Sequence, residues 1–100
     1  MKRKIGIFSL LILSVFAFSQ TGGERLSPGF SMRPYMPFVS DTVQFTDYSR
    51  GNVISWLWDF GDGTTSTLKN PTHKFTTFGN YLISLTISDG TEVATIRVKK

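Results

Sequence analysis

The sequence predicts one all-β domain, an antiparallel β-sandwich, within a chain of 100 residues. Three segments, residues 42–46, 54–60 and 81–88, alternate apolar and polar side chains with a period of two, which is typical of half-buried strands. Clusters of Gly, Asn, Asp and Pro lie between them, and such clusters form turns. No segment shows a sustained helical period. Several short strands at close spacing favour an antiparallel sandwich.

The first 19 residues have the features of a signal peptide. A basic cluster at positions 2–4 precedes an almost unbroken apolar run over residues 5–18, which is shorter than the roughly 20 residues that a membrane-spanning helix needs. Small residues at the end of that run place the predicted cleavage between Ser19 and Gln20. An uncleaved membrane anchor is the alternative. The polar, Gly-containing residues 20–29 are expected to form a flexible lead-in.

Removal of the signal peptide changes the charge of the chain. The full sequence has 11 basic and seven acidic residues, a net charge of +4. Three of the basic residues leave with the signal, so eight basic residues face seven acidic ones and the net charge falls to about +1. No Lys/Arg cluster of the kind that binds a phosphate backbone remains, and nucleic acid is excluded as a partner. The chain has no cysteine, so an apolar core must hold the exported domain together without disulfides.

The domain is expected to begin with a weak strand and continue with a clear one. Two prolines interrupt residues 30–37, so any strand there is short and lies at a sheet edge. Residues 42–46 place Val43 and Phe45 on one face and polar side chains on the other. Asp, Ser, Gly and Asn in residues 47–52 then predict a turn.

The next strand carries both tryptophans of the chain. Within residues 54–60, four side chains share one face at strict alternation and are expected to be buried, namely Ile54, Trp56, Trp58 and Phe60. Glycines at positions 61 and 63 end this strand. Residues 64–70 are polar, and no strand is predicted there.

The carboxyl-terminal part predicts a short strand and a hairpin. Residues 72–77 can form a short strand that carries His73. Residues 81–88 show the clearest alternation, with Tyr81, Ile83, Leu85 and Ile87 on one face. The Asp-Gly pair at 89–90 is a strong hairpin signal, and residues 94–98 form the returning strand.

One hexapeptide of the chain carries a family resemblance. It is similar to the signature of PKD (polycystic kidney disease) domains and consists of Trp58, Asp59, Phe60, Gly61, Asp62 and Gly63. Residues 41–47 upstream, and 70–73 and 79–85 downstream, match the order of turns and strands in that family. The resemblance implies an immunoglobulin-like β-sandwich over residues 30–100. It also implies an accessory module of extracellular proteins that makes protein–protein or protein–carbohydrate contacts.

Turn chemistry accounts for the hexapeptide without catalysis. Asp62 lies between two glycines that permit positive φ, and its carboxylate can accept hydrogen bonds from its own turn. A small glycoside hydrolase with Asp59 and Asp62 as paired carboxylates is the least supported alternative, because no cleft is expected at a tight turn. His73 is the only histidine and no nucleophile elbow accompanies it, so a structural role is favoured. Phe75 stands where tyrosine is commoner in the family. No catalytic residue is assigned.

Calcium binding stays open at this point. Five aspartates are expected at strand ends, where calcium ligands of extracellular sandwiches often lie: Asp41, Asp47, Asp59, Asp62 and Asp89. A hard cation needs six to eight oxygen ligands, and no EF-hand spacing is present. We therefore assign no metal ligand and no cofactor.

Two surfaces are candidates for binding, although the sequence identifies no binding residue. Trp56 and Trp58 could form an aromatic platform for sugars, but the face that they share favours core burial. Leu57 and Leu82 lie on the opposite face and are expected to be exposed, as part of a partner surface.

The sequence thus predicts a secreted or cell-surface module that is not an enzyme. Its expected partner is an extracellular protein or polysaccharide, with no membrane span after signal cleavage. A structural spacer, or a subunit of an envelope assembly, is the alternative function.

Overall fold

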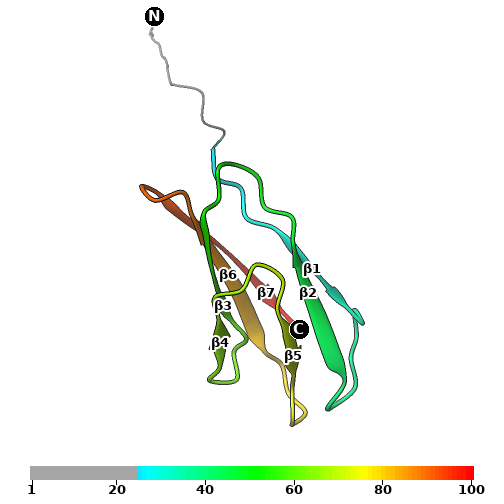
Figure 1. The fold of residues 1–100 in the computed structure, drawn as a ribbon. Coiled ribbons are helices and arrows are strands. Elements are labelled where there is room, and N and C mark those ends of the chain that lie inside the picture. The colour runs from blue at the N-terminus through cyan, green and yellow to red at the C-terminus, as the bar shows by residue number, and fades with distance from the viewer. Residues whose placement is uncertain (1–24) are drawn as a thin grey trace, which may run out of the picture.

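The computed structural model of the protein describes residues 25–100, which form a two-layer β-sandwich (Figure 1). The predicted signal peptide, its cleavage site between Ser19 and Gln20, and the first half of the lead-in, residues 20–24, lie outside the described residues. In the described half of the lead-in, Ser27 exchanges two backbone hydrogen bonds with Arg50. Residues 25–100 contain no helix, and therefore none long enough to cross a membrane.

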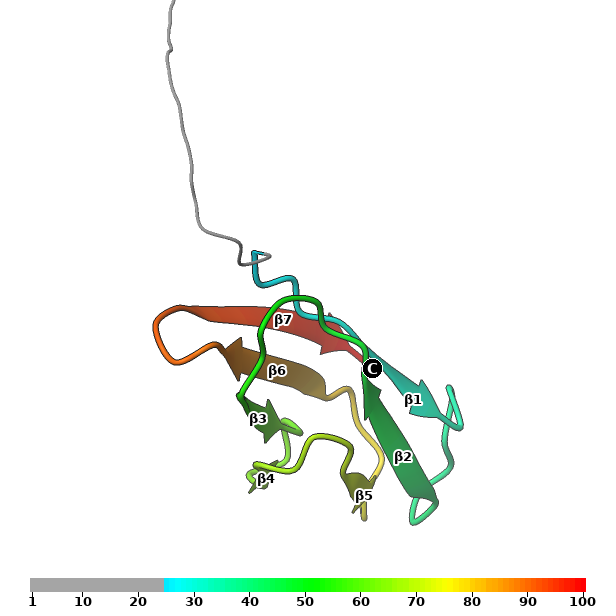
Figure 2. The same cartoon turned by 45° about the horizontal axis from the view of Figure 1, so that its top comes forward.

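Both layers are antiparallel sheets, which confirms the predicted fold (Figure 2). The smaller sheet has the order β1-β2-β5, with β1 (Phe30–Arg33), β2 (Thr42–Asp47) and β5 (Thr72–Lys74). The larger sheet has the order β4-β3-β6-β7, with β4 (Thr65–Ser66), β3 (Ser55–Asp59), β6 (Leu82–Ser88) and β7 (Val93–Lys99). The first strand is short and lies at an edge, as the prolines predicted, and Pro34 follows it directly.

The core lies between the sheets, at positions that the alternation predicted. Trp58 is completely buried, and so are two residues of β2 and three of β6. The buried apolar side chains are Met32, Val43, Phe45, Trp58, Phe60, Phe75, Ile83, Leu85 and Ile87. Aromatic rings meet at its centre, where the ring centroids of Phe45 and Trp58 lie 5.3 Å apart. Aromatic side chains contribute the most buried area per residue, which compensates for the absence of disulfides.

The prediction that Ile54 is buried is wrong. Its side chain is 67% exposed, Trp56 is half-buried, and Val53 of the opposite parity packs against the core instead. The strands of the larger sheet reach seven residues, whereas β2 has six and β5 three. The smaller sheet therefore cannot cover the full length of the larger one. A side chain near the end of the larger sheet, such as Ile54, can face inward and still be exposed.

The polar segment 64–70, in which no strand was predicted, contains β4. This strand has two residues and pairs with β3, so that Ser66 lies opposite Trp58 and Thr65 opposite Asp59. A two-residue strand is too short to show an alternating pattern in the sequence.

The predicted hairpin joins β6 to β7. Seven residues of each strand pair in continuous register, from Leu82 with Lys99 to Ser88 with Val93. In the loop, Gly90 adopts a φ of 94°, which confirms the turn that the Asp-Gly pair predicted. The Asp89 carboxylate accepts hydrogen bonds from the backbone N–H groups of Thr91 and Glu92.

Candidate functional site

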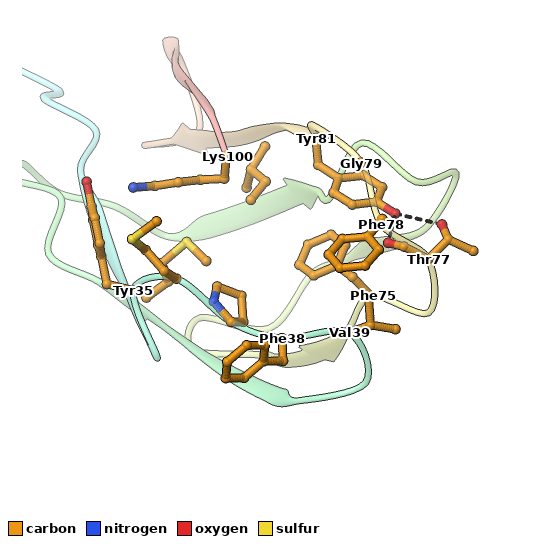
Figure 3. A pocket seen from close by; sticks show the side chains of 13 residues that line it. Tyr35, Phe38, Val39, Phe75, Thr77, Phe78, Gly79, Tyr81 and Lys100 are labelled. Carbon is orange, nitrogen blue, oxygen red and sulfur yellow. Dashed lines mark hydrogen bonds between the residues drawn. The ribbon is translucent and has the colours of Figure 1, made fainter.

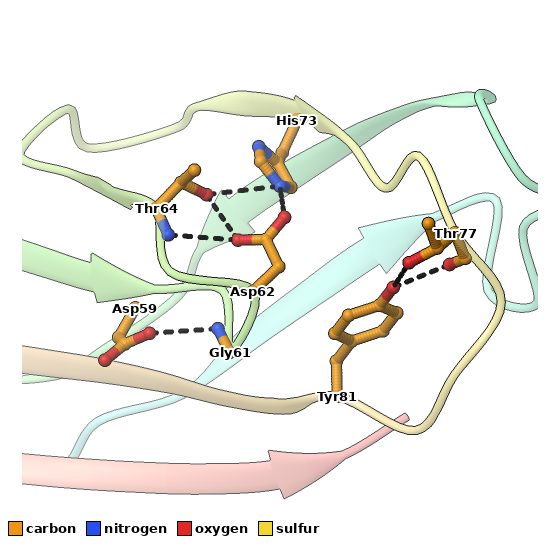
Figure 4. A network of polar contacts seen from close by, with 7 residues as sticks. All are labelled: Asp59, Gly61, Asp62, Thr64, His73, Thr77 and Tyr81. Atoms are coloured by element: carbon orange, nitrogen blue, oxygen red, sulfur yellow. Dashed lines mark hydrogen bonds and ion pairs between the residues drawn. The ribbon is translucent and has the colours of Figure 1, made fainter.

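The glycines of the signature shape a tight turn between β3 and β4. Gly61 has a φ of 79° and Gly63 a φ of 92°, values that side chains rarely allow. A Cβ on Gly61 would lie 2.5 Å from the carbonyl oxygen of Leu82, so β6 passes directly against this turn. Asp59 Oδ1 accepts the N–H of Gly61 at 2.9 Å (Figure 4). The two aspartates of the signature do not share one site, because each serves its own part of the turn.

A histidine from β5 ties this turn to the opposite sheet. His73 Nε2 donates a hydrogen bond to Asp62 Oδ2 at 2.7 Å, since an ionised carboxylate can only accept (Figure 4). Its ring stacks on Phe60 with centroids 4.1 Å apart and planes 4° from parallel. Phe75 meets the same ring edge to face at 4.7 Å. Polar and stacking contacts together hold His73 as a clasp between the two layers.

The electrostatics of Asp62 follow from these contacts. Partial burial acts to raise the pKa of Asp62, but hydrogen bonds from Thr64 and His73 outweigh it and hold the pKa below its ordinary value. Thr64 contributes both its backbone N–H, at 3.1 Å from Oδ1, and its hydroxyl. The carboxylate is therefore stabilised in its ionised form.

This cluster lacks the geometry of a nucleophilic triad. In such a triad the nucleophile and the carboxylate contact opposite nitrogens of the imidazole. Here Asp62 and the Thr64 hydroxyl both lie at Nε2 of His73, at 2.7 and 3.4 Å. The same nitrogen cannot donate to the carboxylate and also take a proton from the hydroxyl.

The aspartates considered for calcium are occupied by their own turns. Among residues 25–100, no three side chains of the His, Cys, Asp and Glu types come together. Each carboxylate accepts a backbone N–H close to it in the chain: Asp41 from Phe38, Asp47 from Ser49, Asp59 from Gly61, Asp62 from Thr64, and Asp89 from Thr91 and Glu92.

The tryptophans do not form an exposed platform. Trp58 is buried, and its Nε1 donates to the carbonyl oxygen of Leu68 at 2.8 Å. Trp56 is half-buried, with the Lys69 ammonium 5.7 Å from the centroid of its ring. Leu57 and Leu82 are exposed, as predicted. Leu57 lies on β3 and Leu82 on β6. The two are not neighbours, because the partner of Leu57 on β6 is Thr86, four positions from Leu82.

An apolar cavity at one end of the sandwich was missed by the sequence analysis. This loop-end pocket lies between the β1–β2 loop and the β5–β6 loop and has a volume of about 390 Å³ (Figure 3). Its lining consists of Met32, Tyr35, Met36, Pro37, Phe38, Val39, Phe75, Thr77, Phe78, Gly79, Tyr81, Ile83 and Lys100.

The loop-end pocket has a buried floor and an exposed aromatic rim. Phe75 and Ile83 of the core form part of the floor, whereas Phe38 on the rim is 79% exposed and Phe78 is 91% exposed. Figure 3 shows Tyr35 and Lys100 on the left, Phe75 and Phe78 to the right of them, and Phe38 below. The Lys100 Nζ lies 3.3 Å from the centroid of the Tyr35 ring, a cation–π contact.

Hydrogen bonds hold both loops of the pocket in place. The N–H of Ser40 donates to the carbonyl oxygen of Phe75 at 2.8 Å, which joins the β1–β2 loop to the end of β5. The Tyr81 hydroxyl donates to the carbonyl oxygen of Thr77 at 2.6 Å across the β5–β6 loop. The rim is thus anchored to the sandwich.

One sequence signal could have revealed the pocket. Residues 35–39 are all apolar or aromatic, yet Pro37 among them and Pro34 just before them exclude a central strand there. Apolar side chains in a loop cannot all enter the core, so some must stay at the surface. The prolines indicated only a weak strand in this segment, and no sequence pattern singled out Phe78.

Comparison with known proteins assigns the family. Residues 38–99 match the sequence model of the PKD domain family. The chain belongs to the PKD domain family. Collagenase ColA of Bacillus cereus is 48% identical over 60 residues, which are 56% of this chain and 6% of that protein. Microbial collagenase of Vibrio alginolyticus is 51% identical over 55 residues, which are 51% of this chain and 7% of that protein. The chain thus spans less than a tenth of these relatives.

Solved structures agree with this family. The PKD1 domain of the Vibrio cholerae metalloprotease PrtV has a TM-score of 0.63 and 30% identity, over 73% of this chain and 90% of that domain. A carbohydrate-binding module of the β-sandwich superfamily has a TM-score of 0.71 and 22% identity, over 79% of this chain and 34% of that one. At that identity the second likeness concerns the fold alone.

Proposed function

We propose that this PKD domain is a non-catalytic binding module, secreted or held at the cell surface, that holds an extracellular polypeptide in the loop-end pocket. One observation carries the proposal. Exposed aromatic and methionine side chains converge on a cavity whose floor belongs to the core. Soluble monomers rarely expose such an apolar group of side chains without a binding role. The cavity volume lies within the range of about 300–1,000 Å³ that is typical of ligand pockets.

The chemistry of the lining favours a polypeptide over a sugar. Only Tyr35, Thr77 and Lys100 offer polar side-chain groups there besides the Tyr81 hydroxyl, which is already bonded to the Thr77 carbonyl. A sugar carries many hydroxyl groups, and each that loses water without a new hydrogen bond weakens binding. An aliphatic, prolyl or aromatic peptide side chain needs no such partners. The curated relatives named above are collagenases, a name that indicates a polypeptide substrate for those enzymes.

A polysaccharide is the second candidate. The exposed rings of Tyr35, Phe38 and Phe78 support it, because sugars stack on aromatic faces. A structural spacer would bind neither class of polymer.

The decisive experiment measures retention of the purified protein on gelatin, casein, cellulose and chitin. We expect retention on the polypeptides, and we expect Phe78→Ser or Phe38→Ser to weaken it at least about tenfold, the size of a typical interface hot spot. Leu57→Ser is the matched control, because Leu57 is exposed and does not line the loop-end pocket. Weaker retention of Leu57→Ser alone would assign binding to the outer face of the larger sheet, where the sequence placed a partner surface. Retention on polysaccharide alone would assign the pocket to sugars. Retention on neither would favour the spacer.

The hydrolase alternative has its own test. We expect no turnover of polysaccharide or peptide substrates by the wild type, because Asp59 and Asp62 are bound in separate parts of the turn. The Asp59→Asn, Asp62→Asn variant should lose about 1–2 kcal/mol of stability per hydrogen bond lost. Wild-type turnover that vanishes in a folded double variant would make this domain a hydrolase.

A further inference from the structure

The last strand of the chain has a free hydrogen-bonding edge. β7 pairs with β6 on one side, and no strand among residues 25–100 pairs with its other side (Figure 2). Tyr81 and Lys100 form a hydrogen-bonded pair, in which each backbone N–H donates to the carbonyl oxygen of the other residue. Hydrogen-bonded and non-hydrogen-bonded pairs alternate along an antiparallel ladder. Residues 94, 96 and 98 therefore bond to β6. The backbone N–H and C=O groups of Val93, Thr95, Arg97 and Lys99 point outward.

This edge lacks the backbone obstacles to pairing, and the obstacle that remains is the charge of its exposed Arg97 and Lys99 side chains. Natural edge strands are commonly shortened, interrupted by proline or bent by a bulge. The other edge strands follow that rule, since β1 has four residues and is followed by Pro34, β4 has two residues and β5 has three. In contrast, β7 has seven residues, contains no proline, and pairs with β6 in a register without a bulge. It offers an added strand the longest regular edge in residues 25–100.

A groove adjoins the carboxyl-terminal half of this edge. It has a volume of about 330 Å³ and lies between β1 and the end of β7, where Phe30, Met32, Tyr48 and Val98 contribute to its lining. The side chains of β7, and those of a strand added to it, point alternately to the same two sides of the sheet. Side chains of an added strand that lie beside Val98 and share its side of the sheet would therefore face this groove. Phe30 and Val98 are only half-buried, so the core is open on this side.

The charges on the outer face select the occupant. Arg97 and Lys99 are exposed, and neither has an ion-pair partner in the part of the chain that the structure describes. Their neighbours on β6 are Ser84 and Leu82, which are uncharged. A second copy of β7 would bring the same cations to the new interface, whereas an acidic segment would complement them.

We propose that the free edge of β7 binds an extended polypeptide segment of a partner protein by strand addition. The segment alternates apolar and acidic side chains. Its apolar side chains enter the groove between β1 and β7, and its acidic side chains lie beside Arg97 and Lys99. Main-chain hydrogen bonds supply affinity and the alternate side chains supply specificity. The edge is a second interaction surface, whose groove shares Met32, Tyr35 and Lys100 with the loop-end pocket. Strand addition to β7 does not rest on the function proposed for that pocket.

The test uses two synthetic peptides and the isotopically labelled protein. One peptide alternates valine with glutamate and the other alternates valine with lysine. We expect the glutamate peptide to protect the amides of Thr95 and Arg97 from hydrogen exchange, because neither amide has a partner among residues 25–100. We also expect it to bind at least about tenfold more tightly than the lysine peptide. No protection of these amides at saturating glutamate peptide would overturn the proposal.

Two variants at Thr95 separate strand addition from other binding modes. Thr95→Pro removes an outward N–H and leaves the ladder to β6 intact, so it should abolish binding. Thr95→Val is the matched control, because both variants lose the 2.8 Å hydroxyl contact with Thr86 but only proline loses the N–H. Peptide binding that survives Thr95→Pro, with amide shifts confined to the loop-end pocket, would refute the edge site.

A charge reversal needs no change in the backbone. The Arg97→Glu, Lys99→Glu variant, at two exposed positions, should reverse the preference and bind the lysine peptide more tightly. An unchanged preference would overturn the assignment of an acidic partner. Analytical ultracentrifugation of the peptide-free protein tests the remaining occupant. A dimer that Thr95→Pro dissociates would assign the edge to a second copy of the chain and refute the acidic segment.

Discussion

Gly61 combines two obstacles to replacement by a larger residue. Its positive φ and its contact with the Leu82 carbonyl oxygen act together, whereas Gly63 has a positive φ and no atom within 4 Å of a Cβ placed on it. Gly63→Ala is therefore expected to cost about 1–2 kcal/mol of left-handed strain. Gly61→Ala should cost about 1–3 kcal/mol more, because β6 must shift to admit the methyl group. Urea denaturation of both variants measures the difference, and equal losses would contradict the close approach of β6.

The lowered pKa of Asp62 predicts how the free energy of unfolding depends on pH. Its pKa is lowered in the folded protein from an ordinary value of 3.8, so its contribution to the free energy of unfolding is present above that value. This contribution disappears as the pH falls through the lower, folded pKa. The difference in unfolding free energy between wild type and Asp62→Asn should thus be greatest above pH 4 and shrink below it.

Chemical denaturation between about pH 6 and pH 2.5 measures this dependence. Asp59→Asn is the control, because it leaves the contacts of Asp62 with Thr64 and His73 in place. A gap between wild type and Asp62→Asn that stays constant over the whole range would show that the clasp makes no electrostatic contribution.

At the scale of the element, β3 shows that alternation along a strand predicts burial at the centre of the strand but not at its end. Trp58 is completely buried at the centre of the strand, whereas Ile54, of the same parity just before it, is 67% exposed. Trp58→Ala is expected to cost about 3–5 kcal/mol, a large part of the total stability of so small a domain. Ile54→Ala should change stability by less than about 0.5 kcal/mol, as is usual for surface positions.

Thermal and urea melts of these two variants test the assignment. A Trp58→Ala variant that melts as wild type and fails to bind its partner would place the indole at a surface. A large loss in Ile54→Ala would show that the opposite sheet covers more of the larger sheet than the structure indicates.

At the scale of the whole molecule, the export signal is the prediction that the structure does not address. We expect the exported protein to begin at Gln20, because small residues precede that position at the end of a short apolar run. Intact mass spectrometry of the secreted product decides this. A product that retains residues 1–19 would indicate an uncleaved membrane anchor.

The sequence by itself determined the longer strands and their inward faces, but it missed the two-residue strand β4 and misplaced Ile54. In β2 and β6, every second residue is apolar over a length that the opposite sheet covers, so the core positions Val43, Phe45, Ile83, Leu85 and Ile87 follow from periodicity. The turns at Gly61 and Gly90 follow equally from local chemistry, because only the backbone and one or two side chains shape them. Such features depend on near neighbours in the chain.

Only the tertiary structure decided the binding surfaces. The loop-end pocket joins residues 35–39 to Phe75 and Phe78, and the groove joins β1 to β7, which stand at opposite ends of the domain sequence. The exposure of Ile54 depends on how far the smaller sheet covers the larger one. The hydrogen bond between Asp62 and His73 depends on how the two sheets pack against each other. Periodicity assigns a side chain to a face of its own strand. The packing of the two sheets then decides what covers that face, and this information is spread over residues far apart in the chain.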